Sequence, residues 1–341
     1  MLSLRLSLCG RAHLPRRSLF ILFGAFLAAG CGGPTSPHTV GPVLVCPNVA
    51  LQSLDGNASP VIYDTPSVVA GESPISGPTC APISGSIFLL GASTVTCTAT
   101  DAAARQASCS FTVTVTAPPR ISVTDLLAFG NSITEGKSAT GVIFPPNTYP
   151  VKLSELLNAR YTAQAITVAN RGRGGESTAQ GAERLRTLLD VLNPEVLLLE
   201  EGINDLSGGD LSKIEPMIAA LRDMIRQARS RSIYVFLGTL LPVREGSPRT
   251  AAFSVLTVAN ERIRLLALAE DVELVDLYDG FGRSADPYID VDGLHPTADG
   301  YAKMAQLFFD AIRATLEAPQ AVSPVFVRNL PVSHLPDGRL R

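Results

Sequence analysis

The stretch EVLLLEEGINDL, residues 195–206, is an aliphatic run that ends directly before a Gly-Ile-Asn-Asp turn. Four other short runs have the same apolar character: LLAFG at 126–130, AITVAN at 165–170, IYVFLGTLL at 233–241 and VELVDLY at 272–278. Runs that are apolar at nearly every position are typical of parallel strands buried on both faces. These five runs therefore predict the strands of one parallel sheet.

Amphipathic segments lie between these runs. One begins at Ser212, where Glu215 three residues later predicts a capping box, and its apolar residues then recur at helical spacing. The final segment repeats this spacing at Tyr301, Met304 and Phe308. Buried strands that alternate with helices predict a three-layer α/β/α domain over residues 119–318. In such sheets the ligand site lies beyond the carboxyl ends of the strands.

Residues 43–118 show a different pattern. STVTCTAT at 93–100 and SCSFTVTV at 108–115 alternate apolar residues with Ser and Thr, which is typical of strands with one buried face. Short strands between turn-rich pieces predict an all-β, immunoglobulin-like sandwich. Four of the six cysteines fall in this segment: Cys46, Cys80, Cys97 and Cys109. They predict two disulfides of an exported protein, because the spacing lacks the C-x-x-C pairs of a zinc site.

The stretch CAPISGSIFLLGASTVTCTATDAAARQASCSFTVTV, residues 80–115, resembles the hyalin repeat, a small β-sandwich module of extracellular proteins. The resemblance implies adhesion or spacing and not catalysis. Four cysteines permit three connectivities. Among these we expect the pairs Cys80 with Cys97 and Cys46 with Cys109.

Residues 1–30 have the character of an export signal, with arginines followed by the apolar run SLFILFGAFLAAG. The small residues that lead into Cys31 resemble the lipobox of bacterial lipoproteins. This resemblance implies two acyl chains on Cys31, hence a stable anchor in a membrane of the bacterial cell envelope, facing the periplasm or the cell surface. Ordinary signal cleavage with full secretion is the alternative. We expect residues 31–42 to form a tether and residues 319–341 a Pro-rich tail.

His295 is the only histidine in the predicted α/β domain. Pro296 disfavours helical geometry at His295, and Thr297 can cap the helix that follows. Asp292 lies three residues earlier, so its carboxylate can bind the ring Nδ1 and leave Nε2 free to accept a proton. Asp290 is an alternative partner. The segment therefore predicts a histidine base held on a loop.

LLAFGNSITEG, residues 126–136, places Ser132 just beyond the carboxyl end of a strand, where it is a candidate nucleophile or a plain helix cap. An acyl-transfer site also needs donors for the oxyanion. The amide of Asn204 and the backbone of the glycine-rich stretch NRGRGGEST, residues 170–178, are the candidates. A phosphate cradle is the alternative for that stretch, although it lacks the Walker lysine and the dinucleotide spacing.

Together, and in this order, FGNSITEG, NRGRGGEST, GIND and DGLH resemble the four blocks of the SGNH/GDSL hydrolase family. The resemblance covers about residues 124–316 and implies a flavodoxin-like sheet. It implies Ser132 as nucleophile, with His295 and Asp292 completing a triad. It also implies an oxyanion hole built from the N–H groups of Ser132 and Gly175 and the side chain of Asn204.

One position departs from the family pattern. Asn131 stands where the family usually has Asp, so the site keeps an acceptor oxygen but loses a charge, and we expect this to tune the site. The segment KSATGVIFPPNTYP, residues 137–150, follows the first block. Its Val142, Ile143 and Phe144 predict either an apolar wall of the acyl pocket or core residues.

The implied activity is hydrolysis of carboxylic esters through an acyl-enzyme, with no metal or organic cofactor. Short-chain esters, lysophospholipids and acetylated polysaccharides are the substrates that the resemblance implies. A net charge of −3 with 17% charged residues argues against a nucleic-acid partner. The alternative function is a non-catalytic surface binding or adhesion protein with a degenerate hydrolase domain.

Overall fold

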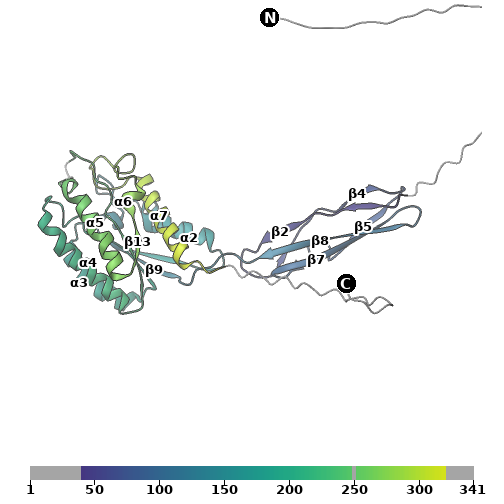
Figure 1. Ribbon diagram of the computed structural model, residues 1–341, viewed down its shortest axis with the longest axis horizontal. Helices are drawn as coiled ribbons and strands as arrows, with labels where there is room; N and C mark the ends of the chain where they lie inside the picture. The colour runs from purple at the N-terminus through teal and green to yellow at the C-terminus, as the bar shows by residue number, and fades with distance from the viewer. Residues whose placement is uncertain (1–39, 248–250, 320–341) are drawn as a thin grey trace, which may run out of the picture.

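The computed structural model describes residues 40–247 and 251–319. The predictions for the export signal, the Cys31 anchor, and nearly all of the tether and the tail lie outside these residues. The described chain forms two domains that follow each other end to end (Figure 1). None of the helices in the described part of the chain is both long enough and apolar enough to cross a bilayer.

The N-terminal domain is all-β, as the sequence predicts. Its strands are β1 (Val43–Val45), β2 (Val49–Gln52), β3 (Ser59–Pro60), β4 (Ser67–Ala70), β5 (Ser76–Ala81), β6 (Ile87–Phe88), β7 (Gly91–Thr100) and β8 (Gln106–Thr116). A four-stranded sheet has the order β2-β8-β7-β5, and β1-β4 and β3-β6 form two-stranded sheets. We call this unit the β-domain.

Alternation along β7 and β8 gives the β-domain one buried face. The buried residues are Val95 and Cys97 of β7 and Phe111 and Val113 of β8. The Ser and Thr residues that alternate with them are exposed or partly exposed. The ring of Tyr63 packs edge-on against Phe111 with centroids 5.1 Å apart. This small core lies between the sheets.

Two disulfides cross-link the β-domain. Cys46 bonds to Cys109 and Cys80 to Cys97, which confirms the expected pairing. The two bonds span 63 and 17 residues of chain. Since Cys97 and Cys109 are opposite each other in the ladder between β7 and β8, both cross-links meet at one level of the sheet.

The C-terminal domain contains a five-stranded sheet in the order β10-β9-β11-β12-β13, with every neighbouring pair parallel. Its strands are β9 (Asp125–Gly130), β10 (Thr167–Gly172), β11 (Val196–Glu200), β12 (Tyr234–Gly238) and β13 (Glu273–Val275). With β9 first in the chain, this order is flavodoxin-like. The predicted fold is therefore confirmed, and we call this unit the α/β domain.

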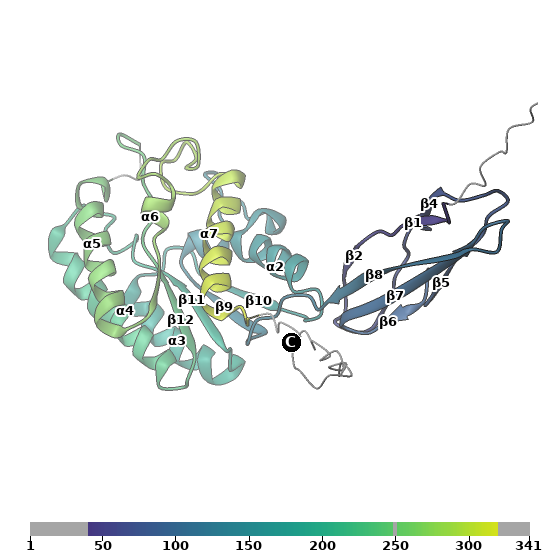
Figure 2. The ribbon, with the colours of Figure 1, turned by 45° about the vertical axis from the view of Figure 1, so that its right-hand side comes forward.

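Helices cover both faces of this sheet (Figure 2). α2 (Tyr149–Arg160) and α7 (Ala298–Leu316) pack together on one face, and α3 (Thr178–Leu192), α4 (Ile214–Arg229) and α5 (Phe253–Glu270) cover the other. The short elements α1 (Ser132–Glu135), η1 (Pro145–Asn147), η2 (Leu211–Lys213) and α6 (Leu277–Gly280) lie in the connections. Because helices cover both faces of the sheet, a ligand site can form only at the ends of its strands.

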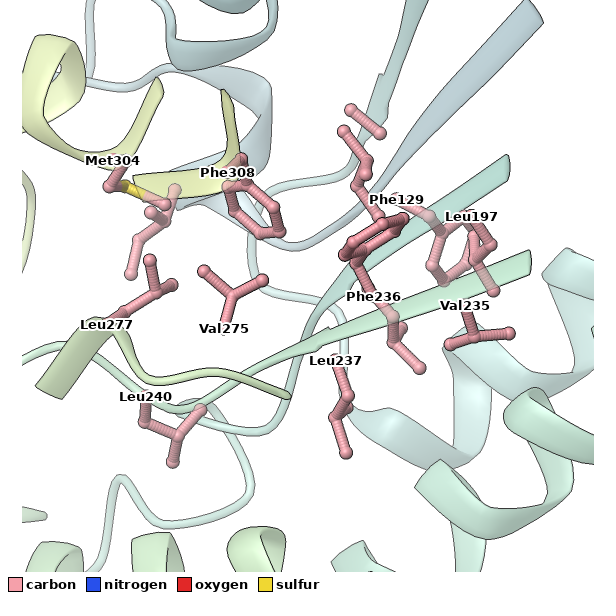
Figure 3. Packing of buried hydrophobic residues seen from close by; sticks show 14 of the residues in the cluster. Phe129, Leu197, Val235, Phe236, Leu237, Leu240, Val275, Leu277, Met304 and Phe308 are labelled. Carbon is pink, nitrogen blue, oxygen red and sulfur yellow. The ribbon is translucent and has the colours of Figure 1, made fainter. Parts of the chain in front are cut away.

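The core of the α/β domain forms where strand side chains meet these helices (Figure 3). Phe129, Leu197 and Phe236 of the central strands and Met304 and Phe308 of α7 are all fully buried. Burying a side chain of this size contributes roughly 1.5–3 kcal/mol. A core of this kind fixes the strand ends that carry the predicted site.

One prediction about a helix start is wrong. α4 begins at Ile214, and Ser212 lies in η2, where its own N–H donates to Oδ1 of Asp210 at 2.9 Å. The 3₁₀ turn that Asp210 caps replaces the predicted capping box. Glu215 instead pairs with Arg262 at 2.7 Å.

Candidate active site

The structure brings the predicted nucleophile and base together although they are 163 residues apart in the chain. Ser132 begins α1, directly after β9, and the Oγ of Ser132 lies 2.9 Å from Nε2 of His295. Both side chains are buried, at 6% and 2% exposure. His295 is held before α7, whose first turn is capped by Thr297, because Oγ1 of Thr297 accepts from the N–H of Gly300 at 3.1 Å. The expected cap is confirmed.

Asp292 holds the other side of the imidazole. Its Oδ2 lies 2.6 Å from Nδ1 of His295, and its Oδ1 accepts from the N–H groups of Leu294 and His295 at 3.1 and 3.0 Å. Burial opposes ionisation of this carboxyl, but the hydrogen bonds from His295 and Leu294 outweigh it, so the pKa of Asp292 is lowered. The carboxyl of Asp290 accepts from the N–H of Val291 instead. Asp292 is therefore the partner of the ring.

The glycine-rich loop after β10 packs against α1. A Cβ at Gly172 would lie 1.9 Å from the backbone N of Glu135, so only glycine permits this approach. The carboxylate of Glu135 accepts from the N–H of Gly174 at 2.9 Å. Gly175 has a φ of +77°, a conformation that favours glycine. These contacts hold the loop beside the turn that carries Ser132.

Asn204 ties a second loop to this one. Its Nδ2 donates to the backbone oxygen of Glu176, one residue beyond Gly175, at 2.9 Å. The adjacent Asp205 accepts from both the N–H and the hydroxyl of Thr178 at 2.9 and 2.8 Å, which fixes the start of α3. The loop after β11 is therefore locked to the loop after β10.

Two backbone donors remain open at this edge. Among residues 40–247 and 251–319, the N–H groups of Ser132 and Gly175 donate to no acceptor. Gly175 is also exposed. Both N–H groups are thus without an acceptor of their own in the described part of the chain, and the hydrogen bond to Glu176 brings the Asn204 side chain to the same loop.

A clamp and a polar cavity border this loop. The guanidinium of Arg184 binds the buried carboxylate of Glu176, donates to the backbone oxygen of Arg171 at 2.9 Å and stacks on the ring of Phe129 at 4.1 Å. Beside this clamp lies a cavity of about 480 Å³. Its lining consists of polar and glycine residues: Arg173, Gly174, Gly175, Glu176, Gln180, Glu183, Arg184 and Thr187.

The segment after α1 carries exposed apolar side chains. Val142 and Phe144 are 62% and 59% exposed, and Ile143 is 38% exposed. They are therefore not core residues. Tyr301 of α7 donates to the backbone oxygen of Lys137 at 2.6 Å, which holds the start of this segment near the His295 loop.

Two buried carboxyls at the end of β11 were missed by the sequence reasoning. Glu200 and Glu201 are 0% and 1% exposed, and within the described chain none of their four carboxyl oxygens has a hydrogen-bond partner. Burial raises the pKa of Glu200 to about 8. Burial and the charges of Glu200 and Glu176 raise the pKa of Glu201 well above its usual range. The sequence did contain a signal for these buried carboxyls, since two consecutive glutamates stand at the end of the apolar run 195–202.

With this geometry established, comparison with known proteins shows where the chain belongs. The sequence profile of the GDSL-like lipase/acylhydrolase family matches residues 128–303, slightly more than half of the chain. The chain belongs to this family. The profile of the HYR domain matches residues 37–115, which include all four disulfide cysteines. The GDSL-like match starts within β9 and ends within α7, and so contains every candidate residue described above.

The GDSL-like region is also similar to individual proteins. A multidomain esterase of Ruminococcus flavefaciens is 28% identical over 201 residues, which are 56% of this chain and 25% of that protein. The match thus spans a quarter of the relative's length. A lipase/acylhydrolase from Enterococcus faecalis is 25% identical, with 58% of this chain and all of that chain covered, at a TM-score of 0.47. An acetylxylan esterase from Geobacillus stearothermophilus is 20% identical, with 56% and 94% covered and a TM-score of 0.47.

Proposed function

We propose that this protein is a serine esterase that hydrolyses carboxylic esters through an acyl-enzyme on Ser132. The observation that carries the proposal is the continuous hydrogen-bonded line from Oγ of Ser132 through the ring of His295 to Asp292, with links of 2.9 and 2.6 Å. Membership in an acylhydrolase family and similarity to a protein named an esterase support the same chemistry.

In this mechanism Nε2 of His295 takes the proton of Ser132 while Oγ attacks the ester carbonyl carbon. The lowered pKa of Asp292 keeps its carboxylate ionised beside Nδ1, so it stabilises the imidazolium that forms. His295 then gives its proton to the departing alcohol, which leaves the acyl group on Ser132. Water, deprotonated by the same ring nitrogen, cleaves this ester and regenerates the serine.

The oxyanion of each tetrahedral intermediate would be held by the N–H groups of Ser132 and Gly175 and the side chain of Asn204. The two N–H groups have no other acceptor within the described residues. Donors fixed before the reaction stabilise the developing charge without reorganisation. Two hydrogen bonds support such a fixed geometry: Asn204 donates to Glu176 of the Gly175 loop, and Gly174 of that loop donates to Glu135 of α1.

For the substrate we favour short-chain esters of polar alcohols, acetylated polysaccharides among them. The polar cavity next to Gly175 supports this choice, because it offers arginine, glutamate and glutamine side chains to a hydroxyl-rich alcohol. The exposed apolar side chains of Val142 and Phe144 offer a surface for the acyl group. Long-chain lipid esters are the competing substrates.

The test compares the wild-type chain with Ser132→Ala on p-nitrophenyl esters from acetate to palmitate and on acetylated xylan. We expect turnover of short esters and acetate release from the polymer, with a loss of at least about 10⁴-fold in Ser132→Ala. A preference for palmitate would move the substrate to lipids. No turnover by folded wild-type protein would reject the esterase and favour a binding or adhesion protein.

We further propose that the chain is exported and anchored in the bacterial cell envelope through acyl chains on Cys31. Two disulfides in the β-domain support export, because such bonds persist in oxidising compartments. Incorporation of labelled palmitate in the producing bacterium is expected for the wild type and not for Cys31→Ala. Release of unlabelled wild-type protein into the medium would instead show ordinary secretion.

A further inference from the structure

Two buried side chains directly behind Ser132 have no role in the mechanism above. Asn131 follows β9 and is 0% exposed, and Glu201 follows β11 and is 1% exposed. The preceding residues, Gly130 and Glu200, are partners in the ladder between these neighbouring strands. Asn131 and Glu201 are therefore the first residues beyond two neighbouring strands, and Asn131 directly precedes the nucleophile Ser132.

Hydrogen-bond accounting shows what each group lacks. Oδ1 of Asn131 accepts from the N–H of Ile133 at 2.9 Å and so caps α1. Among the described residues, Nδ2 of Asn131 and both carboxyl oxygens of Glu201 have no hydrogen-bond partner. The Asn131 side chain acts to lower the pKa of the Glu201 carboxyl, as a neighbouring hydrogen-bond donor does. The two unsatisfied groups are thus complementary neighbours, a donor and an acceptor.

The other groups that act on Glu201 are all acidic. Glu200 adjoins it in the chain, Glu176 lies on the loop before α3, and Asp205 lies on the loop after β11; each raises the pKa of Glu201. Arg184 binds the carboxylate of Glu176. The amide of Asn131 alone among these groups acts in the opposite direction.

We propose that Glu201 is a positioning residue that holds the Asn131 amide, and through it the turn that presents Ser132, so that position 131 needs an amide because position 201 carries a carboxyl. This inference rests on the proposed esterase function. An aspartate at 131 would keep the acceptor that caps α1 but would set a second carboxyl against Glu201. Two carboxyls in one buried site cannot both ionise without strong repulsion.

The test is a double-mutant cycle in the full chain with Asn131→Asp, Glu201→Gln and the double variant. For Asn131→Asp we expect kcat to fall by about tenfold at pH 8, corresponding to one pKa unit of repulsion, with KM little changed. The loss should shrink at pH 6, where the pair retains a shared proton. The double variant exchanges donor and acceptor and should recover to within about threefold of wild type.

Asn131→Asp combined with Glu200→Gln is the matched control. Glu200 is the adjacent buried glutamate, but it is the last residue of β11 and the ladder partner of Gly130, whereas Glu201 lies beyond the strand. This control should leave most of the loss in place. Full recovery with Glu200→Gln, or additive effects of Asn131→Asp and Glu201→Gln, would overturn the pairing.

The same proteins are also unfolded in urea at pH 6 and pH 8, a readout that needs no turnover. We expect a lowered midpoint at pH 8 for Asn131→Asp and its restoration in the double variant. If the wild type hydrolyses no ester, the proposed function fails, and the unfolding cycle alone decides the pairing. If the wild type is active but neither cycle shows coupling, the inference fails and the esterase stands.

Discussion

The β-domain and the α/β domain differ in what holds them together. The β-domain has a small core around Tyr63 and Phe111 and exposes several large aliphatic side chains, including Leu54 and Ile62 at 78% and 85%. Two disulfides cross-link it. The α/β domain has no cysteine and contains a continuous core that reaches from β9 to α7.

The difference bears on where chemistry can be placed. A domain stabilised by a large apolar core can tolerate buried polar groups that are poorly satisfied, and the α/β domain contains two such carboxyls, Glu200 and Glu201. Around them the line from Ser132 to Asp292 is fully hydrogen-bonded. We infer that catalysis depends on the α/β domain alone, whereas the β-domain depends on its cross-links.

The largest expected loss of activity comes from a change beside the predicted base, His295. Asp292→Asn should lower kcat by about 10⁴-fold, because an amide at this position favours the wrong tautomer of His295. Esterase assays with p-nitrophenyl acetate measure it. Asp290→Asn is the matched control and should lose little activity. Equal losses in both variants would remove Asp292 from its assigned role.

A smaller loss is expected at the oxyanion site. Asn204→Ala should lower kcat by about 10²–10³-fold, the usual cost of one oxyanion donor. Since Nδ2 of Asn204 also binds the backbone of Glu176, the melting temperature must be measured alongside. A large fall in melting temperature with an unchanged kcat would assign Asn204 a structural role only.

Removing a cross-link should separate the domains. Cys80→Ser with Cys97→Ser should destabilise the β-domain by about 3 kcal/mol, as expected for a loop of this length, with no change in esterase activity. Two unfolding transitions followed in urea, together with the assay, test this. Lost activity in the folded variant would break the division between the domains.

Per pH unit, the smallest expected effect is the change of stability with pH. With a folded-state pKa of about 8 against an ordinary value of 4.5, Glu200 keeps its proton in the native state and loses it on unfolding between these values. The free energy of unfolding should therefore fall as pH rises through this window, by up to about 1.4 kcal/mol per pH unit. Glu200→Gln should flatten the curve measured by urea unfolding from pH 5 to pH 8. An unchanged slope would show that the pKa of Glu200 in the folded protein is not raised.

Much of the α/β domain could be predicted because its signals are local. Continuous apolar runs identified the strands, and four motifs at strand ends met at one edge, as parallel topology requires. The pairing of His295 with Asp292 followed from a separation of three residues. The all-β pattern and the cysteines of the β-domain were equally local.

What sequence reasoning missed depends on long-range packing. Whether Glu200 and Glu201 are buried is decided by the helices and loops that cover the ends of β9 and β11. The capping box at Ser212 failed because Asp210, two residues earlier, caps a preceding turn. The exposure of residues 142–144 could not be predicted, because an exposed apolar loop and a core segment have the same composition.

The most direct test of the central claim is covalent labelling of the nucleophile. The full chain is treated with a fluorophosphonate probe, digested and mapped by mass spectrometry, with His295→Ala treated in parallel. We predict one adduct, on the peptide that contains Ser132, and little labelling without His295. A folded protein that stays unlabelled, or that carries its adduct on another serine, would contradict the account.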